Sequence, residues 1–137
     1  MPEKFKVEVV TPQGVVLDKE VEEVIAPGIM GEFGVLIGHT PMLTFIKPGI
    51  LSYLEGGKFT RFAVGNGFCE VLKDAVTVLV EEAFAKDAVD AHEASAELKE
   101  LEHQLEGMDS TADPEAYQAV QSKIKLARAK VSLAGES

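Results

Sequence analysis

The amino-acid sequence predicts two parts: an all-β sandwich or flattened barrel in residues 1–84, followed by an antiparallel α-helical hairpin in residues 85–137. Up to residue 82, short apolar stretches alternate with turn residues at a spacing of about 8 to 12 residues, which is typical of sandwiches and barrels rather than of parallel sheets with crossover helices. From Ala83 onward glycine is rare and alanine, glutamate and lysine dominate, as expected for helices.

The first expected strand is the stretch FKVEVV. Phe5, Val7 and Val9 fall on one face there, because successive side chains of a strand point to opposite sides. The stretch EVEEVIA repeats this alternation. Both stretches therefore predict half-buried strands.

Turn residues separate the expected strands. The segments Pro12-Gln13-Gly14, 65–67 and 73–74 interrupt apolar stretches. The pair at 56–57, two glycines, fits a two-residue hairpin loop, in which both central residues need positive φ.

The first helix of the hairpin is expected to begin at Asp87, with Asp90 three residues later, and to end at Gly107. Its apolar residues recur at alternating spacings of four and three, which is the pattern of an amphipathic helix. They are Ala94, Leu98, Leu101, Leu105 and Met108.

The second helix is expected to begin at Asp113, an N-cap residue, with Pro114 at the first helical position. Its apolar residues form one stripe. They are Tyr117, Val120, Ile124, Ala127, Val131 and Ala134. The connection between the helices is short, so an antiparallel hairpin is expected.

The seam of this hairpin is weak. Several seam residues are alanines, and at about 25 cal/mol per Å² of buried apolar area they offset little of the ordering entropy. The first helix is acidic and the second basic, which places Glu93 and Glu97 near Arg128 and Lys130, but exposed ion pairs contribute only about 0 to 1 kcal/mol each. The basic helix is therefore free to exchange partners, or the charges are simply two solvated faces of one small hairpin.

Composition excludes several classes of protein. A net charge of −10 argues against a nucleic-acid binder. Cys69 is the only cysteine, so neither an intrachain disulfide nor a thiolate metal site is expected. No run approaches the roughly 18 apolar residues of a membrane helix, and the charged N-terminus does not resemble a signal peptide. Any membrane association is therefore expected to be peripheral, without direct insertion.

No enzyme site emerges from the motifs. His39 has Glu32 and Thr40 nearby but lacks a nucleophile or a second base, which leaves a stand-alone enzyme using His39 as a weak alternative. His92 and His103 lie three helical turns apart, too far to share a metal. We expect no catalytic residue, no metal and no cofactor.

The stretch of residues 27–49 holds closely spaced glycines whose pattern matches no nucleotide-binding loop. A connection this long is often functional, although a buried structural connection explains the glycines as well.

Three stretches, GEFGVLIGHTPMLTFIKPG, VGNGFCEV and VTVLVEEA, followed by the hairpin, closely resemble the epsilon subunit of bacterial F-type ATP synthases. The resemblance implies a non-catalytic subunit of the central stalk, the rotor of a proton-driven machine. It implies that one surface of the sandwich packs on the gamma subunit, and that the loop from Glu32 to His39 meets the ring of c subunits. Without a transit peptide, the expected location is the cytoplasmic face of the bacterial cell membrane.

The resemblance also implies a regulatory role for the hairpin. In this family it folds on the sandwich or extends into the catalytic head, where its second helix faces an acidic segment of the beta subunit, near alpha, and inhibits ATP hydrolysis. The candidate basic residues here are Lys123, Lys125, Arg128 and Lys130.

An alternative role implied by the family is ATP sensing on the folded hairpin. Here the first helix carries Asp90 and Glu93 where ATP-binding members have an aspartate and an arginine, and the second carries Leu126 and Lys130 where arginines are expected. A glutamate repels phosphate, so we expect Asp90 to start the helix rather than to bind ATP.

Overall fold

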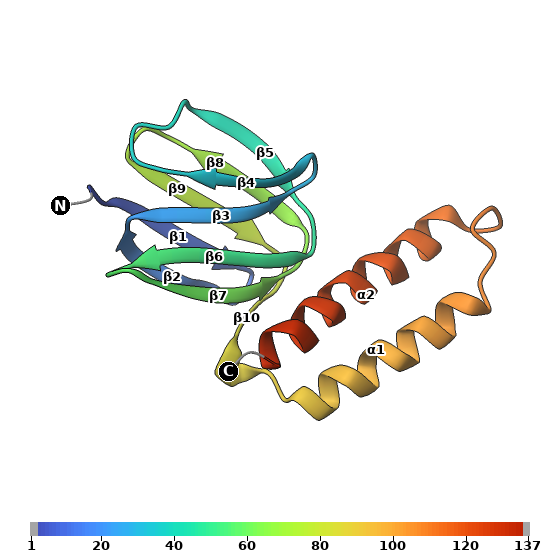
Figure 1. The fold of residues 1–137 in the computed structure, drawn as a ribbon. Coiled ribbons are helices and arrows are strands. Elements are labelled where there is room, and N and C mark those ends of the chain that lie inside the picture. Colours follow the sequence, from blue (N-terminus) through green and yellow to red (C-terminus); the bar gives the residue numbers. More distant parts are fainter. Residues whose placement is uncertain (1–2, 136–137) are drawn as a thin grey trace.

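The computed structural model describes residues 3–135. Within that range ten β-strands form one sheet, curled into a nearly closed sandwich, and two α-helices follow it (Figure 1). The strands are β1 (Phe5–Thr11), β2 (Gly14–Val21), β3 (Glu23–Gly28), β4 (Gly31–Val35), β5 (Met42–Ile46), β6 (Gly49–Glu55), β7 (Lys58–Val64), β8 (Gly67–Val71), β9 (Ala75–Val80) and β10 (Ala83–Ala85). A single 3-10 turn, η1 (Lys86–Ala88), leads into α1 (Ala91–Glu106) and α2 (Pro114–Ala134). The predicted fold class is confirmed.

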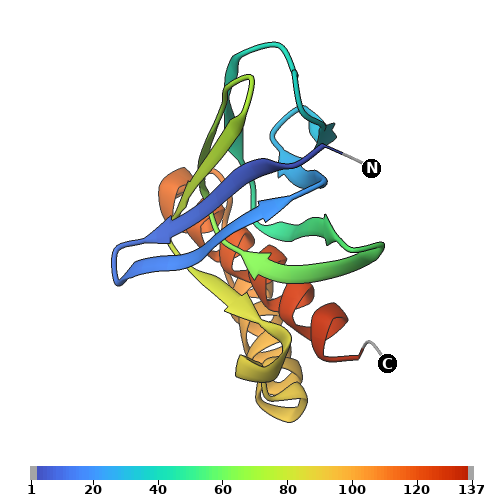
Figure 2. The same cartoon turned by 90° about the vertical axis from the view of Figure 1, so that its left-hand side faces the viewer.

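The sheet follows the order β10-β7-β6-β3-β5-β8-β9-β1-β2, with β4 paired to β3. Strands β1 and β9 run parallel. Figures 1 and 2 show two layers, one made by β5, β8, β9, β1 and β2 and the other by β3, β4, β6 and β7. The hairpin lies beside the second layer, since α2 contacts β6 and β7.

The core lies between the two layers. Phe5, Val7 and Val9 are at most 2% exposed, as their alternation predicts. The two-residue hairpin is also confirmed: it joins β6 to β7, with φ of +60° at Gly56 and +78° at Gly57. Only glycine adopts such angles at little cost, so the sequence specifies this turn.

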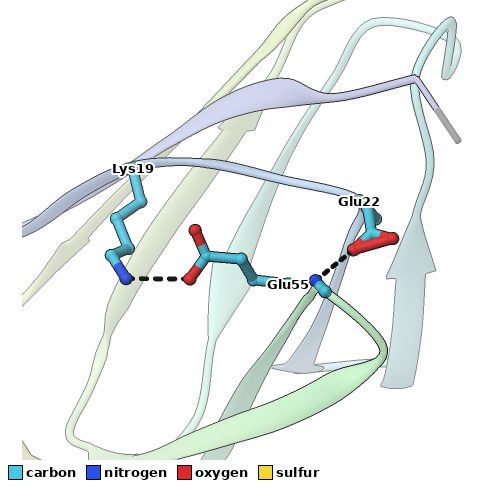
Figure 3. Close-up of polar contacts among 4 residues, drawn as sticks. Lys19, Glu22 and Glu55 are labelled. Carbon is cyan, nitrogen blue, oxygen red and sulfur yellow. Dashed lines mark hydrogen bonds and ion pairs between the residues drawn. The ribbon is translucent and has the colours of Figure 1, made fainter. Parts of the chain in front are cut away.

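The sandwich closes where β2 and β6 meet without pairing as neighbours, and Figure 3 shows the contacts of Lys19 and Glu22 with the end of β6. Lys19 Nζ on β2 lies 2.8 Å from Glu55 Oε1 at the end of β6. The Gly56 N–H donates to Glu22 Oε2 at 2.6 Å, and the Glu22 N–H donates to the Leu54 carbonyl at 2.8 Å. The Lys19–Glu55 ion pair therefore joins β2, the last strand of the sheet, to β6 in the other layer, and the bonds of Glu22 fix the residue between β2 and β3 against the end of β6.

Helix α1 begins later than the sequence predicts. Asp90, not Asp87, is the N-cap: its Oδ1 accepts a hydrogen bond of 2.9 Å from the Glu93 N–H. Asp87 lies in η1, because β10 keeps the chain paired to β7 up to Ala85 and a turn is needed before the helix starts. The expected end at Gly107 is confirmed.

Helix α2 begins as predicted, with Asp113 Oδ1 accepting from the Ala116 N–H at 3.1 Å and with Pro114 at the first position. It buries two faces, whereas the sequence stripe predicts one. The predicted face includes Ile124 and packs on α1. The second face packs on the sandwich around Ala63 and comprises Leu126, Ala129 and Leu133.

Candidate docking surfaces

An apolar row crosses the outward face of the first layer. Phe45 on β5 stands opposite Phe68 on β8, and Phe68 stands opposite Leu79 on β9. Leu79 is paired in register with Val10 on β1, and Val10 with Val15 on β2. Directly opposed residues of paired strands share a face, so these five side chains form one row, called here the apolar row.

The apolar row faces away from the core. Phe45 is 65% exposed and Phe68 is 43% exposed, while Cys69, the residue beside Phe68, is fully buried. At the level of this row the strands therefore carry apolar residues on both faces, although only one face is needed for the core. Contiguous exposed apolar surfaces are typical of protein or membrane contacts and of ligand-binding grooves, so the row is a candidate docking surface.

A second candidate surface is the β4–β5 connection, residues 36–41, which lies at the end of the sandwich away from the helices (Figure 2). The Gly38 N–H donates to the Lys73 carbonyl at 2.8 Å, and Gly38 has φ of +80°, which favours glycine. Leu36 is 58% exposed and Ile37 is 38% exposed. The connection is thus tied to the β8–β9 turn while its apolar side chains face outward.

Glu32 and His39 lie near opposite ends of β4 and form no acid–base pair. Glu32 is exposed on β4, opposite Pro27, and its side chain has no hydrogen-bond or ion-pair partner among residues 3–135. The His39 Nδ1–H donates to the Thr40 carbonyl at 2.7 Å; a carbonyl can only accept, so Nδ1 carries the proton. The stand-alone enzyme alternative therefore gains no support from this arrangement.

The four basic residues of α2 do not share one surface in this state. Lys123 lines a crevice beside the sandwich with Glu81 and Glu82. Lys125 and Arg128 line a cleft of about 520 Å³ between the helices.

Two of these four residues form ion pairs with α1. Lys130 lies 3.4 Å from Glu97, as the sequence predicts. Arg128 lies 3.4 Å from Glu102, so its predicted proximity to Glu93 and Glu97 is replaced by a contact further along α1. In the folded hairpin, the ammonium group of Lys130 is therefore already in contact with Glu97 of α1.

The surroundings of Asp90 are acidic. A crevice between β10, α1 and α2 is lined by Asp90, Glu93, Glu97 and Lys130. Asp90 serves as the helix cap, as expected, and the carboxylates outnumber the one ammonium group. This arrangement is unfavourable for a triphosphate.

Within residues 3–135, no cluster of three or more histidine, cysteine, aspartate or glutamate side chains could hold a metal ion. No helix in the described part of the chain is long and apolar enough to cross a membrane. Cys69 is buried between the layers, and burial raises the pKa of its thiol to about 12.

Known proteins of similar sequence decide the family. Residues 4–86 match the family described as "ATP synthase, Delta/Epsilon chain, beta-sandwich domain". Over all 137 residues the chain is 42% identical to the ATP synthase epsilon chain of Geobacter metallireducens and covers 98% of that relative. The chain belongs to the ATP synthase epsilon-chain family.

Further relatives agree with this assignment. The epsilon chain of Anaeromyxobacter sp. is 37% identical over 128 residues, covering 93% of this chain and 96% of the relative. A chain in the cryo-EM structure of the Euglena gracilis mitochondrial ATP synthase OSCP/F1/c-ring matches with a TM-score of 0.74 and 25% identity, over 93% of this chain and 78% of that one.

A chain of the Tetrahymena thermophila central stalk/c-ring structure shares the fold, with a TM-score of 0.65 and 17% identity over 94% of this chain and 97% of that one. Members of the family are non-catalytic subunits of the ATP synthase complex, which agrees with the expected lack of a catalytic residue.

The sequence motifs identified the family but not the apolar row. Its members lie in strands such as GFCEV and AVTVLV, where apolar residues occupy both faces. Apolar residues on both faces of a strand are the sequence signal that could have identified Phe68 and Leu79 as exposed contact residues.

Proposed function

We propose that this chain is a central-stalk subunit of a proton-translocating F-type ATP synthase and couples rotation of the c-ring to the gamma subunit. The apolar row is the observation that carries the proposal. It presents Phe45 and Phe68 on the layer opposite the hairpin, so a gamma subunit seated there leaves α2 in place on β6 and β7. Burial of large aromatic side chains is the usual energetic centre of a protein interface.

The c-ring contact is assigned to the end of the sandwich formed by residues 36–41 together with Glu32. The hydrogen bond from the Gly38 N–H to the Lys73 carbonyl ties this end to the β8–β9 turn. The polar contacts to the loops of the c subunits are assigned to the side chains of Glu32 and His39. The Glu32 side chain has no partner in residues 3–135 and is available for such a contact. A torque applied by the ring then passes through the sandwich to gamma.

The hairpin is assigned the role of a brake on ATP hydrolysis. Lys123, Lys125, Arg128 and Lys130 lie on more than one side of α2, and they are the residues assigned to contact an acidic segment of the beta subunit, beside alpha, when the hairpin is extended. Of the two helices within residues 3–135, α2 makes the substantial contact with the strands, through Leu126, Ala129 and Leu133, so release of this small face is expected to free both helices. A partner shifts such an equilibrium through contacts made in only one state.

The subunit is expected at the cytoplasmic face of the bacterial cell membrane, held there by its partners. Its regulation is expected to be independent of direct ATP binding, since Asp90 is engaged as a cap and Glu93 and Glu97 line the adjoining crevice. Isothermal titration of the full chain with ATP tests this expectation, and binding at millimolar or lower concentration would count against it.

Deletion of the hairpin separates coupling from inhibition. The truncated chain ends after Lys86, so that β10 keeps its pairing with β7. Reconstituted with the remaining subunits, it is expected to support ATP synthesis at the level of the full chain and to raise the rate of ATP hydrolysis. Loss of synthesis with a folded sandwich would contradict the assigned coupling surfaces, and an unchanged hydrolysis rate would contradict the brake.

A further inference from the structure

Lys130 is the point at which three elements of the folded chain meet. Its Nζ lies 3.4 Å from Glu97 Oε1 on α1 and 4.2 Å from the centre of the Phe84 ring on β10. Phe84 in turn packs against the cluster that joins α2 to the sandwich. One ammonium group on α2 therefore contacts both the other helix and the strand from which the hairpin departs.

The environment of this ammonium distinguishes it from the other ion pair of the hairpin. The side chain of Lys130 is 17% exposed, whereas that of Arg128, paired with Glu102 at the same distance of 3.4 Å, is 63% exposed. Cation–π contacts strengthen as they lose water, whereas exposed ion pairs contribute little. Arg128 joins only the two helices, while Lys130 also reaches the sandwich.

The charged residues that line the crevice together with Lys130 are acidic and favour its present position. The crevice that receives it is lined by Asp90, Glu93 and Glu97 from the start of α1 and by the aromatic face of Phe84 from β10. Opposite charges and a ring face both attract an ammonium group, so the crevice is matched to the end of a lysine side chain.

We propose that Lys130 is a lock that keeps the hairpin folded on the sandwich by inserting its ammonium between Phe84 and Glu97. The inference rests on the proposed brake in one respect: Lys130 is also among the basic residues assigned to the beta subunit. Because one ammonium cannot occupy both places, the locked and inhibiting states exclude each other at this residue. Opening the hairpin releases Lys130 for the partner at the same time as it removes the lock.

The lock is tested on the isolated full-length chain by hydrogen exchange of backbone amides in α1 and α2. Lys130→Met keeps the apolar stem and removes the charge, and it is expected to speed exchange in both helices about tenfold. Phe84→Leu is expected to act in the same direction, and Lys130→Met is expected to add little in that background because the contact is already lost. Lys130→Arg, which retains a cation over the ring, is expected to stay close to the parent chain.

Arg128→Met is the matched control, since it removes an interhelical ion pair of the same length without touching β10. It is expected to change exchange less than about twofold. Unchanged exchange in β1 and β9 shows that each variant keeps a folded sandwich. Equal effects of Lys130→Met and Arg128→Met, or no effect of either, would overturn the lock.

Failure of the lock and failure of the brake give different results. The exchange measurement involves no other subunit and decides the lock alone. ATP hydrolysis by the complex reconstituted with or without residues 87–137 decides the brake alone. A tenfold opening by Lys130→Met together with unchanged hydrolysis on deletion therefore supports the lock and overturns the brake.

Discussion

Phe45 and Phe68 stand opposite each other on neighbouring strands, and both side chains face outward, 65% and 43% exposed. Leu79 stands opposite Phe68 on the neighbouring strand β9. The two phenylalanines are therefore part of a longer apolar surface and are not two isolated exposed residues. Burial of the apolar row against the gamma subunit is expected to hold the sandwich on that subunit.

Replacing either aromatic residue is expected to weaken this association without unfolding the sandwich. Phe45→Ser or Phe68→Ser removes a large exposed ring and should raise the dissociation constant for gamma about tenfold or more. Phe59→Ser is the matched control, because Phe59 is 37% exposed on β7, outside the apolar row. Titration calorimetry measures the affinity. A loss caused equally by the control would count against the assigned surface.

The ion pair that closes the sandwich should give a measurable pH dependence. The hydrogen bond from Lys19 lowers the pKa of Glu55 below its ordinary value of 4.5, so this carboxylate stabilises the fold above that pH and loses its contribution as the pH falls through the folded-state pKa. Glu55 raises the pKa of Lys19 above 10.5, so the contribution of the ammonium is present below that pH and is lost at higher pH.

Urea unfolding of Lys19→Met and the parent chain tests this dependence. The variant is expected to have a lower urea midpoint near neutral pH, and the difference is expected to disappear once acid has protonated Glu55. Glu55→Gln should have a similar effect, and the double variant should be no less stable than either single one, because both remove the same contact. A difference that persists in acid would show that Lys19 acts in another way.

The second buried face of α2 is expected to dominate docking of the hairpin. Leu133 is 1% exposed and packs with Ala63, so Leu133→Ala should destabilise the docked helix by about 2–5 kcal/mol through lost burial and a cavity. Leu98→Ala, at a half-buried position on α1, is expected to cost less. Hydrogen exchange of α2 measures the effect. Unchanged exchange in Leu133→Ala would contradict the assigned role of this face.

The thiol of Cys69 is expected to be inert in the native protein. Burial raises its pKa to about 12, so the reactive thiolate is scarce at neutral pH and reagents cannot reach the sulfur. Labelling by a maleimide should proceed only as fast as the sandwich opens, and added denaturant should accelerate it. Rapid labelling of the native chain would contradict the burial of this residue.

Local patterns were sufficient for much of the fold. The alternation at Phe5, Val7 and Val9 predicts β1, and Gly56 and Gly57 predict the β6–β7 turn, because these signals depend only on nearby residues. The predicted start of α1 at Asp87 is wrong because it depends on a long-range contact. The pairing of β10 with β7 extends strand structure to Ala85, and no residue near Ala85 in the sequence indicates this pairing.

The candidate surfaces were harder to predict. The apolar row joins Phe45 to Phe68 through the register of two strands, which a pattern read along one strand does not reveal. The stripe found on α2 accounts for its contact with α1, while Leu126 and Leu133 form a second stripe that only the position of the sandwich explains. Motif resemblance identified the family because it depends on residue order rather than on these long-range pairings.

Cross-linking from position 32 tests the account most directly. Glu32→Cys is made in the full chain, where buried Cys69 can remain, and the matched control is Glu93→Cys, exposed at the start of α1. In the assembled complex, position 32 is predicted to form adducts with the loops of the c subunits and position 93 is not. Absence of c-subunit adducts from position 32, or equal adducts from both positions, would contradict the assignment of this end of the sandwich to the ring.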